Sequence, residues 1–195
     1  MQLSDLFDYT IVLNSRSPRR KQLLESMGFA LRIVKADIEE SYSKDLKNEA
    51  IPLYLATQKG KAYKGTLADK EILLCSDTMV FYNNIPLGKP KNEQEAFAML
   101  KMISGNTHYV VSACYIKHKD KELSFAEKTK VKFKQLSDDE ITYYIKKYQP
   151  FDKAGAYGIQ EWIGMIGIEA IEGDYYNVMG LPTVSLFAKL KEILC

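Results

Sequence analysis

The stretch Tyr9-Thr-Ile-Val-Leu-Asn-Ser-Arg-Ser-Pro-Arg-Arg20 decides how the chain begins to fold. Its β-branched run at residues 9–13 predicts a short buried strand. Polar residues from Asn14 onward break this strand and a helix follows, with Ser17 suited to the N-cap and Pro18 to the first helical position. A strand, a turn and a helix in this order predict an α/β fold.

Strand and helix patterns are mixed along the rest of the chain. Further strands are expected at residues 31–34, 72–75, 109–117 and 123–133, with short strands around 165–170. Helices are expected at about 50–63, 93–102, 141–148 and 182–194, and the segment 173–182 is expected to be a loop. The segments 79–82 and 85–87 are expected to flank a hairpin turn at Asn83-Asn84, after a break at residues 76–78. We therefore expect a two-lobed α/β protein in a single domain, residues 1–195.

Composition and charge exclude several classes of protein. The chain has 195 residues, of which 46% are hydrophobic and 27% charged, so it is neither collagen-like nor disordered. Its 27 Lys and Arg against 25 Asp and Glu give a net charge of +2. This balance is too even for binding nucleic acid through bulk charge, and we expect no nucleic-acid partner.

Cysteine usage and the absence of long apolar runs bear on location. Cys75, Cys114 and Cys195 are widely spaced, no CxxC pair occurs, and the only histidines are His108 and His118. A zinc site or a disulfide framework is not expected. Acidic residues stand near the start, where a secretory signal needs basic ones, and no run approaches the roughly 20 apolar residues of a membrane span. We expect a cytoplasmic protein with no membrane partner.

The turn at residues 14–17 and the helix after it are a candidate phosphate site. A helix N-terminus offers unpaired backbone N–H groups and a positive dipole end, which suit an anion. Ser15, Ser17, Arg19 and Arg20 add hydroxyl and guanidinium donors. Basic residues are disfavoured at this end of a helix, and a docked phosphate would offset that cost. A solvated basic turn, or a phosphorylation or targeting signal, is the open alternative.

Acidic residues supply candidates for a metal or a general base. Asp77 follows a predicted buried strand, and a carboxylate at the end of such a strand can hold Mg²⁺ or orient a water. Asp37, Glu39 and Glu40 could complete a Mg²⁺ or Mn²⁺ site with Asp77. The alternatives are an Asx turn at Asp77 and a solvated acidic loop at the other three.

Basic and amide side chains later in the chain complete the candidate list. Lys59, Lys61 and Lys89 are possible phosphate cations, although a lysine by itself is normally a surface residue. In the segment 151–160, small residues allow close backbone approach, Lys153 offers a cation, and the Gln160 amide can read a base edge. A glycine-rich turn with a local ion pair between Asp152 and Lys153 is the alternative.

Nucleophilic side-chain catalysis lacks support, because no Ser/His/Asp or Cys/His arrangement is found. The class of reaction left by this search is phosphoryl or nucleotidyl chemistry by a metal-activated water.

Six short motifs occur in a specific order: Ser15-Arg-Ser-Pro-Arg-Arg20, Ser76-Asp-Thr78, Leu87-Gly-Lys-Pro90, Ser104-Gly105 with His108, Asp152-Lys-Ala-Gly-Ala-Tyr-Gly-Ile-Gln160 and Asn177-Val-Met-Gly-Leu-Pro182. In this order, and over nearly the whole chain, the sequence resembles the Maf family of nucleoside triphosphate pyrophosphatases. The resemblance implies a two-lobed mixed α/β fold like that of inosine triphosphate pyrophosphatases, a central nucleotide cleft and a homodimer.

The resemblance also implies an activity and residue roles. The activity is hydrolysis of a nucleoside triphosphate between its α and β phosphates with a divalent cation, Mg²⁺ or Mn²⁺. Asp77 would be the general base, and Glu40 with Asp77 would hold the metal. Substrate contacts are assigned to the loop residues Ser15, Ser17, Arg19 and Arg20 and to the lysines Lys59, Lys89 and Lys153, with Lys61 a rival for the role of Lys59.

Substrate choice can also be expected from the resemblance. Arg19, Thr78 and Gln160 match the branch of the family that acts on dTTP and UTP, and the Gln160 amide can pair with the O4 and N3–H of uracil or thymine. Such an enzyme would remove unwanted nucleotides and could affect cell division. The alternatives are the same chemistry on N7-methylated GTP or another modified nucleotide, and a non-catalytic nucleotide-binding regulator of division. Asn14, Gly60 and Glu161 depart from the family pattern.

Overall fold

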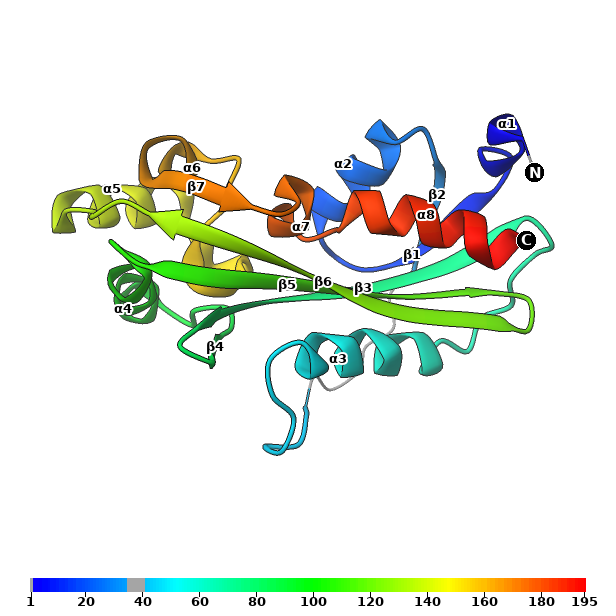
Figure 1. The fold of residues 1–195 in the computed structure, drawn as a ribbon, viewed down its shortest axis with the longest axis horizontal. Coiled ribbons are helices and arrows are strands. Elements are labelled where there is room, and N and C mark those ends of the chain that lie inside the picture. The colour runs from blue at the N-terminus through cyan, green and yellow to red at the C-terminus, as the bar shows by residue number, and fades with distance from the viewer. Residues whose placement is uncertain (1, 35–40) are drawn as a thin grey trace. The chain divides into compact units, whose positions relative to one another are not determined.

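A computed structural model describes residues 2–34 and 41–195 of the chain (Figure 1). Its strands form a mixed seven-stranded sheet in the order β2-β1-β3-β5-β6-β7, with β4 paired to β3. The predicted mixed α/β class is therefore confirmed. The chain divides into two compact units. Unit 1 comprises Met1–Asp77, Ser112–Glu127 and Gly180–Cys195, and unit 2 comprises Thr78–Val111 and Lys128–Met179.

Unit 1 contains the parallel part of the sheet. Strand β1 (Thr10–Asn14) lies between β2 (Ala30–Val34) and β3 (Glu71–Tyr82), and is parallel to both. The helices are α1 (Leu3–Leu6), α2 (Pro18–Ser26), α3 (Ala50–Lys61) and α8 (Thr183–Leu194). Figure 1 shows α3 on one side of these strands and α2 and α8 on the other, the usual solution when both faces of a parallel sheet are apolar.

Close packing holds α3 against the sheet. The buried residues beneath it include Val12, Leu73 and Tyr115. A Cβ atom at Gly60 would lie only 2.1 Å from Cδ1 of the Tyr115 ring. The helix backbone therefore approaches the ring more closely than any larger residue allows, which sets the position of the last turn of α3 and of Lys59 within it.

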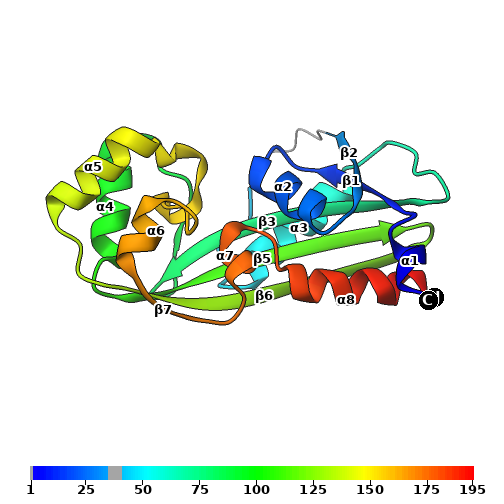
Figure 2. The same cartoon turned by 90° about the horizontal axis from the view of Figure 1, so that it is seen from above.

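Unit 2 is built mainly from the later elements. Its helices are α4 (Glu93–Ile103), α5 (Asp138–Tyr148), α6 (Trp162–Gly167) and α7 (Tyr175–Met179), and its shorter strands are β4 (Ile85–Leu87) and β7 (Ile168–Glu172). The long strands β5 (Thr107–His118) and β6 (Lys121–Phe133) have residues in both units. Helices α4 and α5 pack side by side (Figure 2), and a large apolar core lies between helices and strands.

Local signals placed most element boundaries correctly. The Ser17 hydroxyl accepts a hydrogen bond from the Arg20 backbone N–H and caps α2 as predicted. Ser137 and Glu140 form a capping box at the start of α5. Asn83 and Asn84 both have positive φ and join β3 to β4, which confirms the hairpin turn.

Three expectations were wrong in whole or in part. The break expected at residues 76–78 is absent, because β3 runs without interruption from Glu71 to Tyr82 and includes the segment expected at 79–82. The strands expected around 165–170 are present only in part: residues 168–170 belong to β7, but 165–167 end helix α6, which begins where the N–H groups of Gly164 and Met165 bond to the Glu161 carbonyl. The expected loop at 173–182 contains the short helix α7.

Among the described residues, no helix is both long and apolar enough to cross a lipid bilayer.

Candidate active site

The loop between β1 and α2 has a defined shape that its own hydroxyl groups help to maintain. The Ser15 hydroxyl accepts a hydrogen bond from the Ser17 N–H at 3.2 Å and another from Arg20 Nη1 at 3.1 Å. Ser17 caps the helix, as described above. Arg19, at the second position of α2, is half-buried. The loop thus presents a helix N-terminus with two hydroxyls and a guanidinium close to it, a suitable arrangement for an anion.

Arg20 connects this loop to two distant segments. Its Nε donates to the Gly180 carbonyl and its Nη1 to the Ser76 carbonyl, both at 2.8 Å. Because these donors bond to backbone carbonyl oxygens, Arg20 helps to hold the loop between β1 and α2 in place. They also bring the loop next to Ser76, the neighbour of Asp77.

Asp77 lies inside β3, but its surroundings still match the reasoning that selected it. In the sheet register Asn14, the last residue of β1, is opposite Cys75. Asp77 is therefore two residues beyond the carboxyl end of β1, at the edge where open α/β sheets bind ligands. The prediction that Asp77 directly follows the end of its own strand is wrong, because β3 continues to Tyr82.

The Asp77 carboxylate forms an ion pair with Lys59. Lys59 Nζ lies 2.5 Å from Asp77 Oδ1, and the two side chains are only 13% and 11% exposed. Asn14 supports the pair by donating from Nδ2 to the Lys59 carbonyl at 3.2 Å. The ammonium group orients the carboxylate, and in a largely buried position this interaction is stronger than on the surface.

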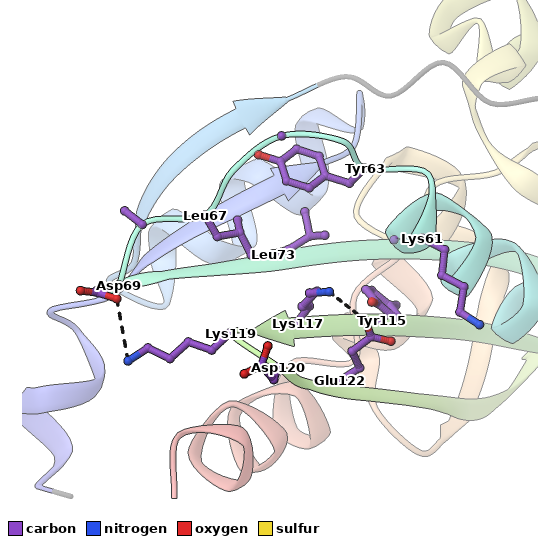
Figure 3. Close-up of a pocket in the computed structure, with 13 residues that line it drawn as sticks. Lys61, Tyr63, Leu67, Asp69, Leu73, Tyr115, Lys117, Lys119, Asp120 and Glu122 are labelled. Atoms are coloured by element: carbon purple, nitrogen blue, oxygen red, sulfur yellow. Dashed lines mark hydrogen bonds and ion pairs between the residues drawn. The ribbon is translucent and has the colours of Figure 1, made fainter.

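Lys61, the rival for the role of Lys59, lies elsewhere. It lines a separate pocket of about 400 Å³ in unit 1 (Figure 3). Charges around this pocket are paired with one another: Lys117 with Glu122 at 3.0 Å, and Lys119 with Asp69 at 3.9 Å. Apart from Lys61, no candidate site residue that the structure describes lines it. Of the two lysines, Lys59 is therefore the one that contacts the predicted acid.

Cysteine nucleophiles are disfavoured by burial. Cys75 and Cys114 are both buried, and burial raises the pKa of each thiol to about 12. The thiolate is the nucleophilic form, so neither side chain is activated at neutral pH.

In unit 2, the turn with Lys89 is tied to the segment 151–160. Lys89 is exposed, and the carbonyl of its neighbour Gly88 accepts a hydrogen bond from the Gly155 N–H at 3.0 Å. Thr78, the first residue of unit 2, is half-buried in β3. The structure therefore brings the Lys89 turn and the glycine-rich segment together within one unit.

Lys153 is almost completely buried and pairs with two carboxylates. Its ammonium lies 2.7 Å from Asp152 Oδ1 and 3.1 Å from Glu161 Oε1. The local ion pair considered from the sequence is present, and a second acid is added to it. The Tyr144 hydroxyl donates to the other Glu161 oxygen. Tyr144 could not be selected from the sequence, because it belongs to α5 and lies outside the motif at residues 152–160.

Gln160 has an unusual environment for an amide. Its Oε1 atom is buried and has no hydrogen-bond partner among the described residues. A buried acceptor without a donor costs free energy, so such an atom indicates a missing donor.

The predicted metal ligands are only partly covered by the structure. Glu40, like Asp37 and Glu39, lies outside the described residues. Within residues 2–34 and 41–195, no group of three or more His, Cys, Asp or Glu side chains is arranged to hold a metal. Asp77 is a single carboxylate, which suits a cation that is bound by one or two carboxylates together with substrate phosphates.

Several known proteins resemble this chain over nearly its whole length. A family model described as Maf-like protein matches residues 10–193. A dTTP/UTP pyrophosphatase of Parabacteroides distasonis is 49% identical over 191 residues, which cover 97% of this chain and 98% of that protein. Proteins of the same description from Phocaeicola vulgatus and Flavobacterium johnsoniae are 46% and 45% identical. Those two matches cover 98% and 95% of this chain, and 100% and 96% of the respective relatives.

Among solved structures, the Staphylococcus aureus Ham1 protein aligns over 93% of this chain and 99% of its own, with a TM-score of 0.49 and 14% identity.

Proposed function

This chain belongs to the Maf-like protein family, and from that premise we propose that it is a nucleoside triphosphate pyrophosphatase that hydrolyses dTTP and UTP to the monophosphate and pyrophosphate. The observation that carries the proposal is the Lys59–Asp77 pair beside the loop at residues 14–17. An oriented carboxylate next to an anion-binding helix terminus suits hydrolysis of a phosphate anhydride.

The loop and the start of α2 are proposed to hold the triphosphate. Ser15, Ser17 and the backbone N–H groups at the helix start supply neutral donors, and Arg19 supplies a cation. Arg20 keeps the loop beside Ser76 through its bonds to protein carbonyls. We propose that Lys89 and Lys153, in unit 2, contact the same nucleotide.

Asp77 is proposed to accept the proton of the attacking water. The water oxygen bonds to the α-phosphorus, the bond from that phosphorus to the α–β bridging oxygen breaks, and pyrophosphate leaves with that oxygen. The proton goes to the Asp77 carboxylate, which Lys59 keeps oriented at 2.5 Å. Positioned general-base catalysis of this kind typically contributes about 10²–10⁴-fold to a rate.

A divalent cation fits the donor set around Asp77. We propose that Asp77 and Glu40 hold Mg²⁺ or Mn²⁺ together with oxygens of the substrate phosphates. When bound, such an ion supplies positive charge against the phosphate oxygens and makes a coordinated water more acidic.

The unpaired oxygen of Gln160 supports the choice of base. Its buried Oε1 needs a donor, and the N3–H of uracil or thymine is a donor in a position where cytosine has an acceptor. The Gln160 amide N–H₂ can in turn donate to O4. Arg19 and Thr78 are proposed to contribute to this specificity with Gln160.

The test is a panel of triphosphates assayed for pyrophosphate release with Mg²⁺ or Mn²⁺. We expect selective turnover of dTTP and UTP, and in ¹⁸O-labelled water we expect the label in the monophosphate, because the α-phosphorus is attacked. Preference for N7-methylated GTP or another base would contradict the specificity argument alone. Absence of turnover on every nucleotide would favour a non-catalytic nucleotide-binding regulator.

The family resemblance also leads us to propose a homodimer that works in the cytoplasm on the nucleotide pool. Sedimentation equilibrium gives the mass of the particle in solution, and a monomer at micromolar concentration would contradict the dimer. Cell fractionation with an antibody against the chain tests the location.

A further inference from the structure

The segment that carries Gln160 is held in place by one carboxylate, that of Glu161. We propose that Glu161 is a positioning residue, which fixes the loop from Lys153 to Gln160 in the shape that reads the nucleotide base. This inference rests on the proposed function, because it assigns Glu161 a part in the base recognition proposed for Gln160.

Side-chain contacts of Glu161 join the two ends of the loop. Its Oε1 lies 3.1 Å from the Lys153 ammonium, at the start of the loop. Its Oε2 accepts a hydrogen bond from the Tyr144 hydroxyl, and the Tyr144 oxygen accepts one from the Gly158 N–H at 3.0 Å. A single carboxylate thereby connects α5, the first residue of the loop and a backbone group near its end.

Backbone contacts anchor Glu161 itself. Its N–H donates to the Gly158 carbonyl at 3.0 Å, and its own carbonyl accepts from the Gly164 N–H at 2.9 Å as α6 begins. Gln160 precedes Glu161 directly. Its backbone is therefore confined between a tight turn on one side and a helix start on the other.

Burial makes this network stiff. The side chains of Lys153 and Glu161 are only 9% and 19% exposed, and Tyr144 is fully buried. Hydrogen bonds to charged groups are short and strong in such surroundings, and they resist rearrangement. The Gln160 Oε1 atom has no partner within the described part of the chain, so its direction depends on the backbone that Glu161 holds.

Gly158 provides a second way to disturb the same carboxylate. A Cβ atom at Gly158 would lie 2.8 Å from Glu161 Cδ and 2.9 Å from Oε2. These distances are too short for ordinary contact, and the backbone of Gly158 does not have a positive φ. An alanine at this position would therefore displace the Glu161 carboxylate without straining the main chain.

The experiment compares base discrimination in a double-mutant cycle. The measured quantity is the ratio of kcat/KM for dTTP to that for dCTP, in the wild type, Gln160→Ala, Glu161→Ala and the double variant. We expect each single substitution to lower the ratio by about tenfold, the effect of losing one well-directed hydrogen bond. The double variant should be no worse than Gln160→Ala alone, since Glu161 acts through Gln160.

Two further variants keep the test informative if Glu161→Ala folds poorly. Tyr144→Phe removes only the hydroxyl that donates to Glu161, and Gly158→Ala displaces the carboxylate. Both should lower the dTTP to dCTP ratio in the same direction. A merely structural role would lower the activity on both nucleotides equally and leave the ratio unchanged.

The outcomes separate this inference from the proposed function. Suppose that the wild type hydrolyses dTTP but that Glu161→Ala, Tyr144→Phe and Gly158→Ala all keep the dTTP to dCTP ratio within about twofold of the wild-type value. The positioning role is then overturned and the pyrophosphatase proposal stands. The same conclusion follows if the effects of Glu161→Ala and Gln160→Ala on this ratio add in the double variant. If the wild type hydrolyses no triphosphate, both proposals fail.

Discussion

In unit 1 the Lys59 ammonium pairs with the Asp77 carboxylate, whereas in unit 2 the Lys153 ammonium pairs with the carboxylates of Asp152 and Glu161. The first pair joins helix α3 to strand β3. The second group carries one excess negative charge and is bonded further to Tyr144. The Asp77 carboxylate lies next to Ser76, to which the candidate phosphate loop is bonded, whereas the Glu161 carboxylate is bonded to Lys153 and Tyr144 and joins two parts of one loop. The two sites therefore should respond differently to substitution.

The largest difference is expected at Asp77. Asp77→Asn keeps the shape of the side chain but removes the proton acceptor, so kcat for dTTP should fall by about 10³-fold, within the range for general-base catalysis. Binding of a non-hydrolysable triphosphate analogue, measured by calorimetry, should persist. An unchanged kcat would show that Asp77 takes no part in the reaction. Asp77 and Glu161 would then no longer differ as expected, with Asp77 setting the rate and Glu161 the base preference.

The next effect is expected at Lys59, with Lys61 as the matched control. Lys59→Met leaves the Asp77 carboxylate without its orienting partner, and we expect kcat to fall by about 10²-fold. The free energy of unfolding should fall by roughly 2 kcal/mol, between the values for exposed and fully buried pairs. Lys61→Met, two residues away on the rim of the other pocket, should change stability by no more than about 0.5 kcal/mol. Equal effects of the two substitutions would contradict the assignment of Lys59.

A packing prediction compares two glycines, one in each unit. Gly60→Ala forces a methyl group into the Tyr115 ring, and such overpacking should cost about 2 kcal/mol of unfolding free energy, measured by urea denaturation. At Gly88 nothing lies within 4 Å of an added Cβ, and φ there is not positive, so Gly88→Ala should be neutral or slightly stabilising. If Gly60→Ala is also neutral, α3 can move away from the sheet and its packing does not hold Lys59 in position.

The effect that is smallest at neutral pH, and that grows only as the pH falls, concerns the unit 2 core. His108 is fully buried, its Nε2 lies 2.7 Å from the Tyr157 hydroxyl, and burial lowers its pKa to about 3. Between pH 6.5 and 3 the unfolded chain binds a proton at this residue and the folded chain does not. Stability should therefore fall as the pH falls through this range, by about 1.4 kcal/mol per pH unit from His108 alone.

His108→Gln provides the control, because its amide can still pair with Tyr157 but does not titrate. The slope of unfolding free energy against pH, measured between pH 4 and 6, should be flatter in this variant. An identical slope in both proteins would mean that other groups account for the acid sensitivity.

Local elements of this fold could be predicted because their causes are local. The strand at residues 10–14, the Ser17 cap and the Asn83-Asn84 turn depend on neighbouring residues and on backbone preferences. The continuity of β3 across residues 76–78 was missed because polar side chains interrupt the apolar pattern there. Helix α6 was missed because a short glycine-containing apolar run does not distinguish a helix from a strand.

The candidate residues, the family and the class of reaction could all be predicted from the order of the motifs along the chain and from side-chain chemistry. The sequence alone determined that hydroxyl and guanidinium donors, an acid and an amide occur in a specific order. The contacts among them required the folded chain. Lys59 rather than Lys61 reaches Asp77 across 18 residues, Arg20 bonds to Gly180 across 160, and Tyr144 and Glu161 close around the loop at residues 153–160. Such contacts follow from strand register and helix packing, which bring together side chains that are far apart in the sequence. Local sequence patterns therefore do not predict them.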